Sequence, residues 1–255
     1  MEALKFRKAA LLVSLCFWTF TVFSQVKEDT IFQNEYLLVL NTYTSDAPWS
    51  NAIISPILQW LNAERKTEVY VENMNMLMID DSLKLADLKS TIFAKYGKKK
   101  PKAVLLLGNS MLLFRNEMRE AWGDIPLILC GEENYMGPDD CYIKKYPVVP
   151  SEQVPLTNFT EEYNLTLLQT RVFIEENVKL LQHMIPDMKK IILIGDGRYV
   201  NQQLNVDLKQ LLQKKYSNLE YDFYSAANMT TDSLLLKLNK VNREYFFRHG
   251  SPAKW

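Results

Sequence analysis

The residues most able to bind or react are polar and aromatic side chains that directly follow short apolar runs. Each run has the length of a buried strand, so these residues lie at the carboxyl ends of predicted parallel strands. In open α/β sheets, small ligands bind along that edge. Rings mixed with amides, hydroxyls and a few charges suit a cleft for a polar small molecule. The candidate ligand-binding residues are Tyr43, Thr44, Trp49, Glu72, Asn75, Asn109, Ser110, Glu132, Arg171, Asp196, Arg198 and Tyr199.

Several candidates also have a purely structural interpretation, and the sequence leaves both open. Trp49 could pack where the next helix starts, and Glu72 could bind backbone amides at its strand end. Asn109 and Ser110 could cap the following helix, because short polar side chains accept hydrogen bonds from the free amides of a first helical turn.

Catalytic, metal and cofactor chemistry have little support in the sequence. The paired acids at 80–81, 132–133 and 139–140 are typical of helix starts and solvated turns, because adjacent side chains of an extended chain point apart. There is no G-x-S-x-G elbow, and the 8 glycines form no phosphate-binding loop. The two histidines and the cysteines have no ligand-like spacing. We therefore expect no catalytic residue, no metal and no cofactor, and a protein that is not an enzyme.

The N-terminus predicts export. A basic start precedes an apolar stretch of 15 residues, Ala9–Phe23, and Ser24 supplies a small residue before a cut at Gln25. This is the pattern of a secretory signal peptide over residues 1–24. A bilayer span needs about 20 apolar residues, so an uncleaved anchor is the weaker alternative. We expect a periplasmic or otherwise extracytoplasmic protein with no membrane span after cleavage.

The charge limits the classes of binding partner, and the cysteine content limits the disulfides that could form. Lysine plus arginine and aspartate plus glutamate each number 30, so nothing attracts nucleic acid or anionic lipid, and no nucleic-acid partner is expected. After cleavage only Cys130 and Cys141 remain. They could pair in an oxidising compartment, or Cys130 could be a buried thiol at a strand end with Cys141 free or loosely held; the sequence does not decide.

The elements that must position the candidate residues alternate in a regular way. Strands are predicted at 36–40, 67–72, 103–107 and 125–130, and helices at 50–64, from Asp80 or Asp81 onward, and at 109–121. This alternation predicts right-handed βαβ crossovers and a parallel sheet. Residues 33–132 are therefore expected to form an N-terminal α/β lobe.

The regular alternation is then interrupted. Residues 133–163 hold four prolines and no sustained period, so we expect a long loop between lobes. Strands at 165–169, 191–195 and 220–223 and helices at 174–184, 201–216 and 231–241 predict a second α/β lobe over 164–241. The tail, 242–255, is expected to be irregular with no further strand. So short a lobe would leave a sheet edge exposed, and we expect a truncated or frameshifted chain.

Five segments, in order and spacing, make the chain resemble the periplasmic sensor region of Bacteroidetes-type sensor histidine kinases, including hybrid two-component ones. That region is similar to ABC-transporter substrate-binding proteins of the periplasmic-binding-protein type 1 fold. The resemblance covers about residues 36–240. The segments are LLVLNTYTSDAPW (37–49), EVYVENMNM (68–76), FAKYGKKKPKAVLLLGNS (93–110), IPLILCGEENYMGP (125–138) and MIPDMKKIILIGDGRYVNQQ (184–203).

The resemblance implies an α/β fold of two Rossmann-like lobes with parallel sheets, joined by a hinge, with the second lobe incomplete. It also implies a small-molecule ligand in the inter-lobe cleft, and a homodimer through the N-terminal lobe is a further expectation. In the related sensors the position of Asn75 is often Asp, so a charge role there is in doubt. The rest of the second lobe, a transmembrane helix and the kinase parts would complete such a sensor.

Three functions compete at this point. The first is the extracytoplasmic small-ligand-sensing domain of a two-component sensor histidine kinase, present as a fragment without transmembrane or kinase parts. The second is a free-standing periplasmic solute-binding protein of an ABC-type transporter. The third is a secreted α/β enzyme such as a hydrolase, for which the sequence shows no clustered acids. The mixed cleft residues do not separate a sugar from an amino acid or a nucleoside.

Overall fold

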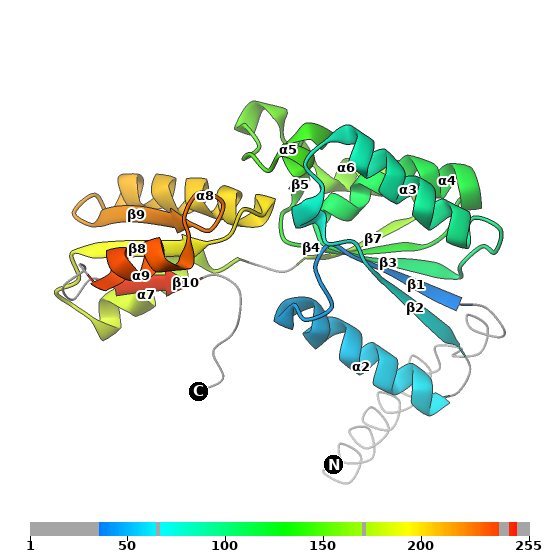
Figure 1. The fold of residues 1–255 in the computed structure, drawn as a ribbon, viewed down its shortest axis with the longest axis horizontal. Coiled ribbons are helices and arrows are strands. Elements are labelled where there is room, and N and C mark those ends of the chain that lie inside the picture. Colours follow the sequence, from blue (N-terminus) through cyan, green and yellow to red (C-terminus); the bar gives the residue numbers. More distant parts are fainter. Residues whose placement is uncertain (1–35, 65–66, 170–171, 240–244, 249–255) are drawn as a thin grey trace, which may run out of the picture.

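The computed structural model describes residues 36–64, 67–169, 172–239 and 245–248 of the chain. The predicted signal peptide over 1–24 and the candidate Arg171 lie outside the described residues. Figure 1 shows two α/β units side by side, the first built mainly from the N-terminal half of the chain. No helix in the described ranges is long and apolar enough to cross a bilayer.

The first unit is a five-stranded parallel sheet in the order β2-β1-β3-β4-β7. Apolar side chains fill every position of β3 and all but the last of β1, and every residue of both strands is buried, as expected for a parallel sheet covered on both faces. The strands are β1 (Tyr36–Asn41), β2 (Glu68–Asn73), β3 (Ala103–Leu107), β4 (Leu127–Gly131) and β7 (Leu165–Gln169).

Helices cover the two faces of this sheet unequally (Figure 1). The helix α2 (Pro48–Glu64) covers one face, where Ile54 and Leu61 pack on Val39 and Leu105. The other face holds α3 (Ser82–Tyr96), the 3₁₀ turn η2 (Asn109–Phe114) and α4 (Arg115–Trp122). The predicted start of α3 is confirmed, because the Asp81 carboxylate accepts the Lys84 amide at 2.8 Å.

The predicted long loop over 133–163 is wrong in the structure. The segment forms β5 (Tyr135–Met136), α5 (Asp139–Lys144), η3 (Pro150–Glu152), β6 (Val154–Pro155) and α6 (Leu156–Glu162). Its buried apolar side chains, among them Met136 and Tyr142, belong to the main core of the first unit. These elements are too short to give a recognisable period, and only packing against the sheet defines them.

The second unit is a three-stranded parallel sheet in the order β10-β8-β9. Its strands are β8 (Lys190–Gly195), β9 (Glu220–Ser225) and β10 (Tyr245–Arg248), and its helices are α7 (Ile174–Met184), α8 (Tyr199–Lys215) and α9 (Thr231–Asn239). The separate core of this unit joins Ile191 and Leu193 of β8 to Leu204 and Leu208 of α8.

Two boundaries of the predicted second lobe are wrong. The strand at 165–169, β7, pairs with β4 and completes the first sheet, so the first unit extends to Gln169. The tail at 242–255 was expected to lack a strand, yet Tyr245–Arg248 form β10 and pair with Ile191–Ile194 of β8. In both cases a strand's membership depends on a distant partner, which its own residues do not specify.

The two cysteines of the described chain do not pair. Cys130 is buried in β4, and Cys141 is buried in α5; both are free thiols. The interpretation of Cys130 as a buried thiol is confirmed, whereas Cys141 is packed in the core rather than loosely held.

A cavity between the two α/β units

A cavity open to solvent lies where the two units meet, with about 420 Å³ of empty space when the solvent at its mouth is included. Loops after β1, β2, β3 and β4 of the first sheet and after β8 of the second border it, so the carboxyl ends of both sheets contribute to one site. The lining residues are Thr42, Tyr43, Met76, Leu77, Asn109, Ser110, Glu132, Tyr142, Lys145, Arg198, Tyr199 and Val200.

Glu132 is the centre of the wall supplied by the first unit. One of its carboxylate oxygens accepts the Tyr43 hydroxyl, and the other accepts the Asn109 amide at 3.1 Å. The Asn109 carboxamide oxygen in turn accepts the Glu132 amide at 3.0 Å. Burial raises the pKa of Glu132 and raises that of Tyr43 well above its ordinary value. These three side chains therefore fix one another between the ends of β1, β3 and β4.

The close packing around Glu132 also requires a glycine at position 108. Gly108, between β3 and Asn109, has a φ of 96°, a region that side chains rarely adopt. A Cβ at this position would lie 2.5 Å from Thr42 Oγ1 and 3.3 Å from Glu132 Oε1. The close approach of these strand ends thus depends on a glycine.

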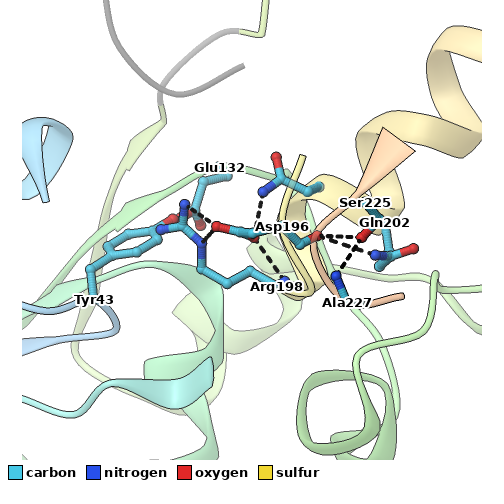
Figure 2. A network of polar contacts seen from close by, with 8 residues as sticks. Tyr43, Glu132, Asp196, Arg198, Gln202, Ser225 and Ala227 are labelled. Carbon is cyan, nitrogen blue, oxygen red and sulfur yellow. Dashed lines mark hydrogen bonds and ion pairs between the residues drawn. The ribbon is translucent and has the colours of Figure 1, made fainter. Parts of the chain in front are cut away.

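Arg198 is the principal contribution of the second unit, and Figure 2 shows it reaching across to Tyr43. Its guanidinium carbon lies 5.0 Å from the centre of the Tyr43 ring. Asp196 holds the arginine from behind, with Nη2 and Nε each 2.6 Å from one carboxylate oxygen. Asn201 donates to the other oxygen of Asp196 at 2.6 Å, which fixes the turn between β8 and α8.

Two further contacts join the units beside the cavity. The rings of Tyr142 in α5 and Tyr199 in α8 have centroids 4.5 Å apart. The buried Gln203 carboxamide accepts the Val148 amide at 3.0 Å and donates to Asp207 at 2.9 Å. The segment 133–163 therefore forms the contact to α8, although it belongs to the first unit.

The structure gathers six of the predicted candidates at the cavity: Tyr43, Asn109, Ser110, Glu132, Arg198 and Tyr199. Asp196 supports Arg198 without lining the cavity, and Trp49 packs edge-on against Tyr43, with ring centroids 5.6 Å apart, at the start of α2. Asn109 is not a side-chain cap; besides Glu132 it donates to the Tyr135 carbonyl at 2.9 Å. The Ser110 and Thr42 hydroxyls bond one another at 2.9 Å.

Three candidates lie away from the cavity. Glu72 accepts Lys95 Nζ at 2.6 Å and the Tyr96 hydroxyl, so it joins β2 to α3 rather than facing a ligand. Asn75 precedes the 3₁₀ turn η1 (Met76–Met78) in a left-handed conformation, and Thr44 is exposed. The geometry of the cavity therefore does not support these three residues as ligand contacts.

Six lining residues were not among the candidates. Thr42, Met76, Leu77 and Val200 follow strands, so the rule that selected the others could have found them. Tyr142 and Lys145 belong to α5 and the residue after it, in a segment without a recognisable period. No group of three or more histidine, cysteine or acidic side chains in the described ranges is arranged to hold a metal.

No protein-family model matches the chain, and no curated protein matches it. Solved structures with distant similarity include an ABC domain in complex with L-Trp from Streptococcus pneumonia, at 13% identity and TM-score 0.48, covering 84% of this chain and 65% of that one. An extracellular ligand-binding receptor from Rhodopseudomonas palustris HaA2 has 13% identity and TM-score 0.46, covering 86% and 54%.

A sugar transporter from Clostridium phytofermentans has 16% identity and TM-score 0.45, with 81% of this chain and 68% of that one covered. The chain spans less than two thirds of the length of the first two structures.

Proposed function

We propose that this chain is an extracytoplasmic ligand-sensing domain of a two-component sensor histidine kinase, which binds a small molecule between its two α/β units. The observation that carries the proposal is the cavity at which the strand ends of both sheets meet, because each unit supplies side chains to it. A ligand there would touch both units at once. The sequence resemblance to sensor regions of such kinases supplies the signalling context, and the predicted signal peptide supplies the compartment.

The contacts between the units suggest how binding would act. Described contacts between the units include the arginine–ring pair of Arg198 and Tyr43 at the cavity and the hydrogen bond between Val148 and Gln203 beside it. A ligand that binds the closed arrangement more tightly than an open one would shift the population toward closure by that difference in affinity. Hinge closure of this kind is a common way for a binding site between two units to transmit occupancy.

A thermal-shift screen of the 255-residue chain with sugars, amino acids and nucleosides tests ligand binding. A ligand at about 100 times its Kd should stabilise the folded state by about 2.7 kcal/mol, which is readily measured as a rise in Tm. Ser110→Leu, which fills the cavity, should abolish the shift, whereas Ser90→Leu, on the exposed side of α3, should leave it. Binding that survives Ser110→Leu would contradict the site, and a screen without any shift would contradict the function.

The signalling context is tested separately by the DNA around the coding sequence. A histidine kinase module encoded in continuation with this chain supports the sensor assignment. Adjacent permease and ATPase genes would instead support the alternative, a solute-binding protein of an ABC-type transporter. The expected homodimer through the N-terminal unit stays a prediction, which the mass measured by light scattering checks.

A further inference from the structure

Lys145 is a cation held in a fixed position at the wall of the cavity. It follows α5 in a left-handed backbone conformation, with φ 59° and ψ 44°. Its ammonium donates to the Ile79 carbonyl at 2.8 Å and to the Ile143 carbonyl at 3.1 Å. A lysine ammonium has three N–H donors, so one donor remains after these two bonds.

Lys145 also forms no direct ion pair within the described ranges, in contrast to Arg198. Asp196 neutralises Arg198 at 2.6 Å, whereas no carboxylate of the described ranges lies within ion-pair distance of Lys145. Asp80, whose charge acts on Lys145, is itself paired with Lys84 at 2.5 Å. A half-buried cation that keeps one free donor is suited to an anionic group from a ligand.

Other lining groups are compatible with an anion at this end of the cavity. The Tyr142 hydroxyl accepts the Gly137 amide at 3.0 Å, so its own proton remains to be donated. The Tyr199 hydroxyl is buried near the hydroxyls of Tyr135 and Tyr142. Glu132 would repel an anion, but both of its oxygens already accept protein donors, and the charge of Arg198 acts on it.

The remaining wall is polar at Thr42, Asn109 and Ser110 and apolar at Met76 and Leu77. Met76 is buried, and Leu77 is 39% exposed, although both line the cavity. Leu77 also approaches the second unit, where its Cδ1 would lie 3.7 Å from a Cβ added at Gly197. A ligand that reached from Lys145 across the cavity would therefore cover apolar side chains with its body.

We infer that the cavity takes a small organic carboxylate with an apolar body, and that Lys145 binds its carboxylate group. This inference rests on the proposed function and adds the chemical class of the ligand. It does not distinguish a free monocarboxylic acid from the carboxylate of an amino acid, because Lys145 would recognise either one through the same group.

The experiment compares acids with their primary amides by isothermal titration calorimetry of the 255-residue chain. The probes are 3-phenylpropionate, 4-methylpentanoate, L-phenylalanine and L-leucine, each paired with its amide, together with glucose and adenosine as uncharged ligands. We expect at least one acid to bind about 10-fold or more tightly than its amide, which corresponds to the interaction of one charged group. Preference between the first two acids and the two amino acids identifies the source of the carboxylate.

Variants of Lys145 test whether this side chain causes the preference for acids over amides. Lys145→Met should bring the acid-to-amide affinity ratio close to one, and Lys145→Arg should keep part of it. The matched control is Lys144→Met, because Lys144 is the preceding residue but is exposed and paired with Asp140 at 2.6 Å; its ratio should equal that of the wild type. If Lys145→Met does not fold by circular dichroism, Tyr142→Phe, which removes only the neighbouring hydroxyl, should lower acid affinity more than amide affinity.

The possible outcomes distinguish failure of the carboxylate inference from failure of the proposed ligand-sensing function. Equal binding of acids and amides, binding of uncharged probes only, or a ratio that survives Lys145→Met overturns the carboxylate inference while ligand binding stands. Absence of binding by every acid, amide and uncharged probe, together with no shift in the broader thermal screen, overturns the proposed function as well.

Discussion

The two units contribute to the cavity in different ways. The first supplies nine of the twelve lining residues, from loops after four strands and from the segment around α5. The second supplies three consecutive residues, Arg198, Tyr199 and Val200, from the N-cap and first turn of α8. The first wall is fixed by hydrogen bonds among buried groups, whereas the main polar group of the second, Arg198, is half-buried and held by one aspartate.

This difference suggests a division of labour between the units. A wall whose side chains fix one another selects a ligand by its shape and charge, because the groups cannot rearrange to suit others. A wall that is one short segment, whose described contacts with the opposite unit are mainly the ring contacts of Arg198 and Tyr199, can move as a body. On the proposed function, the first unit would therefore set specificity and the second would report occupancy.

The largest effect should come from breaking the fixed wall. Asn109→Ala removes the acceptor of the Glu132 amide and the donor to the Tyr135 carbonyl, so several buried groups lose partners. We expect the free energy of unfolding to fall by about 2–4 kcal/mol in urea denaturation. Asn205→Ala, which removes the acceptor of the Tyr221 hydroxyl in the second unit, should cost about 1 kcal/mol. Equal losses in both variants would remove the contrast between the walls.

A smaller effect on stability is expected from the pH, because Glu133 is a partly buried acid near the contact between the two units. Burial and the like charges of Asp207 and Glu132 raise the pKa of Glu133 to about 8. An unfolded glutamate titrates near about 4.3, so the folded state binds more protons between these pH values and stability falls as the pH rises. We expect Tm to fall by about 3 °C or more between pH 5 and pH 8.

Two variants test whether the Glu133 carboxyl causes the pH dependence of Tm. Glu133→Gln carries no charge at this position, so it should flatten the fall of Tm between pH 5 and pH 8. Glu161→Gln alters an exposed residue of α6 and should retain the slope of the wild type. A wild-type slope in Glu133→Gln would show that this carboxyl does not carry the effect.

The smallest change in stability should come from the movable wall. Arg198→Met removes the guanidinium from Tyr43 and from Asp196, yet half-buried ion and ring pairs contribute less than about 1 kcal/mol. Affinity for a ligand found in the screen should nevertheless fall about 10-fold, because Arg198 lines the cavity. Arg119→Met breaks a similar pair with Tyr163, 4.4 Å from guanidinium to ring, on a residue that does not line the cavity. Equal affinities for the two variants would contradict a role of Arg198 in binding.

The sequence-based prediction of the site was best for residues that directly follow a buried strand. Tyr43, Glu132 and Arg198 were selected because they come directly after buried apolar runs, and all three line the cavity. Glu72 met the same criterion but bonds to Lys95 and Tyr96 instead. β2 lies at the edge of the first sheet, so a residue at its end can turn toward α3 rather than toward the second unit.

The sequence by itself determined the local elements, because a buried strand and an amphipathic helix each leave a pattern within their own residues. The apolar runs of β1, β3 and β8 and the acidic start of α3 could be read in this way. Only the tertiary structure decided which strands share a sheet, since β7 and β10 find partners far away in the chain. It also brought Lys145 to the cavity, because α5 is positioned by packing on the first core and not by any period of its own.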